Sequence, residues 1–135
     1  MTIPALRLAA CAFVVLLCDG IFVGFLMRRP YAHMVASVQK SPLILRKVPA
    51  LVASLSVVSG LWGISLCNEN PWNGDDQKNA AVFGLSAFLI YNATNLAIFE
   101  AWSLRNAVID TFYGTTLCAL TYAGVAGVIS NPTGT

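Results

Sequence analysis

Residues 8–27 decide the fold: their sequence, LAACAFVVLLCDGIFVGFLM, carries one charged side chain, Asp19, in twenty positions. Twenty helical residues extend about 30 Å, which matches the hydrocarbon thickness of a bilayer. Arg7 comes directly before the run and Arg28 directly after it. The run therefore predicts a helix that spans a membrane.

The composition of the whole chain supports this environment. Of its 135 residues, 57% are hydrophobic and 10% are charged, whereas a soluble domain carries about 25% charged residues. The lipid bilayer is therefore the expected main contact. The net charge is only +2, and the sequence has no cluster of basic residues with interleaved aromatics of the kind that binds nucleic acid. Nucleic acid is not an expected partner.

Three more apolar runs follow the first one along the chain. Pro49 opens the second run, where a first-turn proline costs little, and the polar residues Ser130 and Asn131 follow the last one. We predict an all-α membrane protein, a single domain of residues 1–135 folded as a four-transmembrane-helix bundle. Its expected spans are residues 8–27, 48–67, 80–102 and 107–129.

The connection between the first two spans has a helical pattern of its own. Tyr31, Met34, Val35 and Val38 recur at helical spacing between two prolines. This pattern predicts a short interfacial amphipathic helix over residues 30–40 that lies on the inner membrane surface.

Basic residues are divided unequally between the two ends of the bundle. Six of the eight fall in residues 28–47 and 103–106, and only Arg7 and Lys78 fall elsewhere. Because short cytoplasmic or matrix-side connections are rich in Lys and Arg, we expect both termini on the outer side. The outer side is the periplasm or the intermembrane space.

Polar residues inside the spans are the strongest candidates for function, because a charge at the bilayer centre costs at least about 2.5–3.5 kcal/mol. Asp19 and Asn92 are expected near the midplane, and Asn95 and Asp110 closer to the inner side. We expect these four side chains to meet inside the bundle. They either line a polar cavity for a substrate or protons, or hold the helices together by hydrogen bonds, and we favour the second interpretation.

No pattern indicates catalysis or a cofactor. Cys11, Cys18, Cys67 and Cys118 form no metal-ligand spacing, so no metal or other cofactor is expected. The serines of the second span have no His or Lys at matching depth, so we expect a protein that is not an enzyme.

Small residues recur at four-residue spacing and are typical of close helix packing in lipid. The expected packing positions are Gly20, Gly24, Ala93, Ala97 and Gly114.

Three short motifs follow one another on the expected spans. They are Cys18-Asp19-Gly20-Ile21-Phe22-Val23-Gly24, then Tyr91-Asn92-Ala93-Thr94-Asn95-Leu96-Ala97, then Asp110-Thr111-Phe112-Tyr113-Gly114-Thr115. In order and spacing they resemble domain-of-unknown-function family 2177, small predicted four-span membrane proteins of bacteria. The resemblance implies the four-span topology, adds Thr94 to the polar positions, and implies no activity. Asn92 stands where the family pattern has an acid, which favours a structural role for this cluster.

Two hypotheses on function follow from these observations. The first is a non-catalytic accessory subunit of a larger membrane complex, an energy-transducing one, with other transmembrane subunits and structural lipids as partners. The second is a small transporter or channel-like protein, with Asp19 and Asn95 along its path. The expected location is the inner membrane of an organelle, with the mitochondrion favoured, or the bacterial inner membrane.

Overall fold

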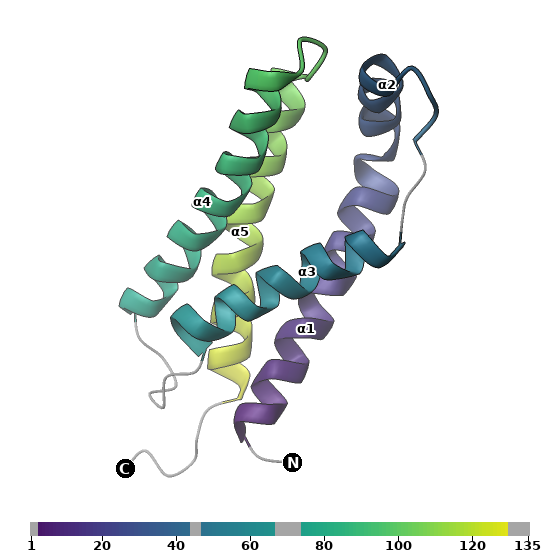
Figure 1. Ribbon diagram of the computed structural model, residues 1–135. Coiled ribbons are helices and arrows are strands. Elements are labelled where there is room, and N and C mark those ends of the chain that lie inside the picture. The colour runs from purple at the N-terminus through teal and green to yellow at the C-terminus, as the bar shows by residue number, and fades with distance from the viewer. Residues whose placement is uncertain (1–2, 44–46, 67–73, 130–135) are drawn as a thin grey trace.

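The computed structural model describes residues 3–43, 47–66 and 74–129, and all regular structure in these residues is helical. Four long helical segments and one short helix follow one another along the chain (Figure 1). The all-helical class predicted from the sequence is confirmed.

The first and second long segments each end in a π-helical turn. α1 (Ile3–Ile21) continues into η1 (Phe22–Leu26), and α3 (Lys47–Leu61) continues into η2 (Trp62–Leu66). α3 crosses α1 obliquely (Figure 1). Their crossing buries a core to which α1 contributes Cys11 and Val15 and α3 contributes Val58 and Leu61.

The connection between these segments contains α2 (Arg28–Gln39), as the spacing of its apolar residues predicts. The helix ends at Lys40, which adopts the left-handed conformation with φ 57°, and Pro42 follows shortly after. Tyr31 is half-buried and Met34 is buried, and the backbone N–H of Ser103 donates to the sulfur of Met34 at 3.4 Å. This part of the predicted apolar stripe therefore packs against the start of α5 rather than facing away from the protein.

α4 (Gly74–Ile98) and α5 (Leu104–Val128) run side by side in opposite directions (Figure 1). Acidic residues suit the positive end of a helix dipole, so Asp75 and Asp76 in the first turn of α4 favour its early start. At the other end, the hydroxyl of Ser103 accepts from the backbone N–H of Asn106 at 3.3 Å and caps α5. The tight connection is therefore residues 99–103 rather than the expected 103–106.

α5 is the helix with the most buried face. Its buried residues include Asp110, Gly114, Cys118 and Tyr122, and Tyr122 is only 1% exposed. The guanidinium Nε of Arg7 donates to the backbone carbonyl of Ile129 at 2.9 Å. This contact joins the start of α1 to the end of α5 and brings the two ends of the described chain together.

Among the described residues, three segments are long and apolar enough to cross a membrane. They are Ile3–Leu26, Lys47–Leu66 and Gly74–Ile98, with mean hydropathies of 2.4, 1.7 and 1.5. α5 has 25 residues but is not among them, because threonine, tyrosine and aspartate side chains lower its hydropathy. The structure thus supports three of the four spans predicted from the sequence.

Candidate functional site

The first polar contact is centred on Asp19, a half-buried residue of α1. Its Oδ2 accepts a hydrogen bond from the hydroxyl of Ser54 at 2.8 Å, and its Oδ1 accepts one from the hydroxyl of Tyr113 at 2.9 Å. The ring of Tyr113 stacks on that of Phe22, with centroids 3.7 Å apart. One carboxylate therefore joins α1, α3 and α5 and satisfies both of its oxygens.

The second polar contact is centred on Asp110 of α5, which is only 6% exposed. Its Oδ1 accepts from the hydroxyl of Tyr31 at 2.7 Å, and its Oδ2 accepts from the side-chain amide of Asn92 at 2.7 Å. The same amide nitrogen also donates to the carbonyl oxygen of Phe88 at 3.0 Å. This carboxylate joins α2, α4 and α5.

The Tyr31 hydroxyl keeps the proton that it donates to Asp110. Burial and the neighbouring charge of Asp110 raise the pKa of Tyr31 above its ordinary value. Tyr31 therefore stays protonated at physiological pH, as a hydrogen-bond donor must.

The sequence-predicted polar residues are brought together only in part. Asn92 contacts Asp110 directly, whereas the partners of Asp19 are Ser54 and Tyr113 rather than an amide. Asn95 is half-buried and Thr94 is exposed. The described residues thus contain two polar centres, which we call the Asp19 centre and the Asp110 centre.

Three members of this hydrogen-bond network were not predicted from the sequence: Ser54, Tyr31 and Tyr113. Tyr113 lies three residues after Asp110 and thus on the same helix face, which was the available signal. Tyr31 was predicted only as part of an apolar stripe. Nothing in the sequence distinguishes Ser54 from Ser56, whose hydroxyl donates to the carbonyl of Val52 in its own helix at 2.8 Å.

Of the small residues predicted to pack, Gly114 lies at a close approach of two helices. A Cβ on Gly84 would lie 2.5 Å from the carbonyl oxygen of Gly114, and a Cβ on Gly114 would overlap the ring of Phe88. α4 and α5 can approach this closely only because both positions are glycine. The other predicted packing residues face outward: Gly20 and Gly24 have open space where a Cβ would stand, and Ala93 and Ala97 are exposed.

Two cavities lie away from both polar centres. One, of about 510 Å³, lies where α2 meets the start of α5. The other, of about 340 Å³, lies between α1 and α5 and is lined by apolar residues and Thr121. Neither is lined by Asp19 or Asp110. Among the described residues, no group of three His, Cys, Asp or Glu side chains could hold a metal ion.

Long apolar helices joined by internally paired polar side chains define a helical integral membrane protein. The sequence model of the family described as "Predicted membrane protein (DUF2177)" matches residues 5–129. The chain belongs to this family, and the resemblance found in the three sequence motifs is confirmed. Searches of curated proteins and of solved structures returned no match.

Proposed function

We propose that the chain is a four-span, non-catalytic accessory subunit of a larger membrane complex. The observation that carries this proposal is that the carboxylates of Asp19 and Asp110 are both hydrogen-bonded within the chain. All four of their oxygens accept hydrogen bonds from side chains of other helices. Such bonds hold transmembrane helices together, and they account for both carboxylates without a transported ion or substrate.

The fourth span of this proposal is α5. Its 25 residues extend about 37 Å, which exceeds the hydrocarbon thickness. Its polar residues Asp110 and Thr121 are buried, so they do not meet lipid. A helix at the centre of a bundle can therefore span the membrane with a lower mean hydropathy than its neighbours.

Outward-facing small residues support a partner within the membrane. Gly20 and Gly24 lie one turn apart with open space above them. Large apolar side chains lie nearby on the same segment, with Phe25 81% exposed. Glycines at this spacing allow the backbone of another helix to approach closely.

The proposed setting is an energy-transducing complex in the inner membrane of an organelle, with the mitochondrion favoured, or of a bacterium. Both termini are proposed to face outward. The clustering of six basic residues at the opposite end supports this orientation, as the positive-inside rule requires.

The experiment tests the outward-facing glycines without disturbing the fold. Gly20→Leu combined with Gly24→Leu fills open space, so the chain should still accumulate in the membrane but should leave its complex on native gels. Gly124→Leu, which also fills open space, is the matched control on α5 and should assemble normally. If the wild-type chain migrates alone, or the double variant assembles as the wild type does, the accessory role is refuted.

A further inference from the structure

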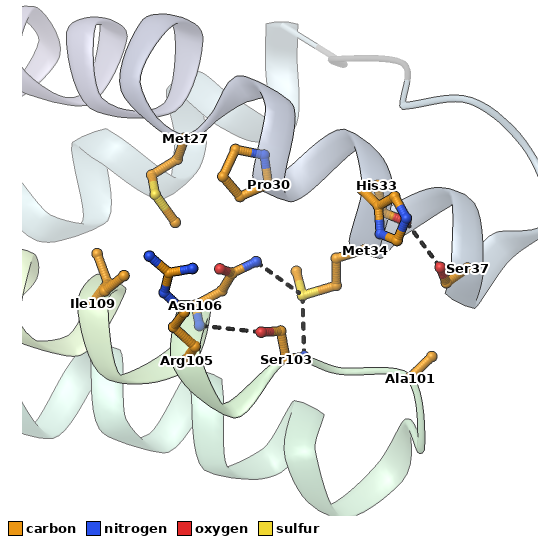
Figure 2. Close-up of a pocket in the computed structure, with 10 residues that line it drawn as sticks. All are labelled: Met27, Pro30, His33, Met34, Ser37, Ala101, Ser103, Arg105, Asn106 and Ile109. Atoms are coloured by element: carbon orange, nitrogen blue, oxygen red, sulfur yellow. Dashed lines mark hydrogen bonds between the residues drawn. The ribbon is translucent and has the colours of Figure 1, made fainter.

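The larger cavity lies close to three basic residues, Arg28, Arg29 and Arg105. It opens between α2 and the first turn of α5 and has a volume of about 510 Å³ (Figure 2). Its lining consists of Met27, Pro30, His33, Met34, Ser37, Ala101, Ser103, Arg105, Asn106 and Ile109. The polar centres described above use none of these side chains.

One cationic side chain in this lining has no partner among the described residues. The guanidinium of Arg105 points into the cavity, toward Met27 and beside Asn106 (Figure 2), and it makes no hydrogen bond or ion pair with the described part of the chain. Arg105 lies in the first turn of α5, which begins at Leu104, so the positive end of the helix dipole adds to the positive potential of the guanidinium. The cavity therefore attracts an anion.

No carboxylate lines the cavity to neutralise this charge. Asp110 is the nearest acid along α5, and its oxygens accept hydrogen bonds from Tyr31 and Asn92 rather than from Arg105. Glu100 is exposed in the connection before α5 and is not part of the lining. The guanidinium thus remains available to a ligand from outside the chain.

Besides Arg105 and the polar side chains of His33, Ser37, Ser103 and Asn106, the lining is apolar. This apolar part continues into the apolar surface of the helices. Met27 and Met34 are buried in the wall, and Ile109 and Pro30 complete it. Next to the cavity, Leu26 and Leu104 are 62% and 66% exposed. A ligand that fits this combination has an anionic head and an apolar body.

We propose that this cavity binds the phosphate of an anionic phospholipid, with Arg105 donating a pair of hydrogen bonds to the phosphate oxygens. Guanidinium groups match phosphate in this geometry, and basic pockets at the inner ends of transmembrane helices recognise anionic headgroups. The acyl chains then lie along Leu26 and Leu104. The site requires only that the chain resides in a membrane and does not depend on an accessory role.

The test is native mass spectrometry of the purified full chain titrated with phosphatidylglycerol, phosphatidylcholine or inorganic phosphate. Phosphatidylglycerol is expected to bind at least about tenfold more tightly than phosphatidylcholine, because the choline cation offsets the phosphate charge that Arg105 recognises. Arg105→Gln should remove this preference, and Arg105→Lys should restore part of it. Arg29→Gln is the matched control, because it removes the same charge from an exposed residue outside the lining. This variant should still prefer phosphatidylglycerol.

Two results would overturn the proposal. If Arg105→Gln and Arg29→Gln reduce phosphatidylglycerol binding by the same factor, general surface charge attracts the lipid and the cavity is not its site. If inorganic phosphate binds and displaces phosphatidylglycerol from the wild-type chain, the ligand is a soluble phosphate rather than a lipid.

Discussion

Replacement of Asp19 by leucine should destabilise the fold. Leucine accepts no hydrogen bond, so Ser54 and Tyr113 lose their partner at 2.8 and 2.9 Å. Ser54 can turn to a carbonyl of its own helix, as Ser56 and Ser59 do, but the half-buried Tyr113 hydroxyl has no such alternative. An unsatisfied buried group costs about 1–3 kcal/mol, which lowers the melting temperature of a chain of this size by roughly 4–12 °C.

Asp19→Asn is the matched variant, because the amide can accept from one hydroxyl and donate to the other. We expect it to melt within about 4 °C of the wild type, the shift that loss of about 1 kcal/mol produces. With Cys18 and Cys67 replaced by serine in every variant, the buried thiols of Cys11 and Cys118 should react with a fluorogenic maleimide only on unfolding and so report the transition. Equal melting of Asp19→Leu and the wild type, or equal losses in both variants, would refute the bonding pattern.

Three further outcomes are expected. Gly84→Ala should destabilise the chain by about 1–3 kcal/mol, because its Cβ would press on the backbone of α5, whereas Gly124→Ala, in open space, should be neutral or stabilising in the same melting assay. Tyr31→Phe should cost about 1 kcal/mol and should accelerate amide hydrogen exchange in α2, and unchanged exchange would contradict this. In sealed vesicles, an impermeant maleimide should label Lys78→Cys from the outer side and Gln39→Cys only from the inner side, and the reverse pattern would refute the proposed orientation.

Hydropathy predicted where the helices lie but not where they end. The expected span 80–102 became α4, Gly74–Ile98, because hydropathy marks the apolar part of a helix and ignores its polar first turn. Asp75 and Asp76 belong to the helix although they are hydrophilic. Polar residues also lower the hydropathy of α5. Asp110 and Thr121 are buried inside the protein, so hydropathy alone understates how well this helix suits a membrane.

Depth along the spans predicted that the polar residues meet inside the bundle, but it placed Asn92 level with Asp19, whereas Asn92 contacts Asp110. Depth was also not enough to predict the partners of Asp19, because depth does not fix the rotation of a helix about its axis. Helices that are apolar all round give no amphipathic pattern from which that rotation can be read. Ser54 and Tyr113 therefore became recognisable as partners only once the faces of α3 and α5 were known.

The role of the two carboxylates is tested most directly by neutralising both of them. Asp19→Asn combined with Asp110→Asn keeps hydrogen-bonding groups at both centres and removes only the charges. The double variant should assemble into its complex on native gels and should restore growth to a deletion strain as the wild-type gene does. If it assembles normally but does not restore growth, the carboxylate charges themselves perform the function, and the transporter interpretation replaces the accessory one.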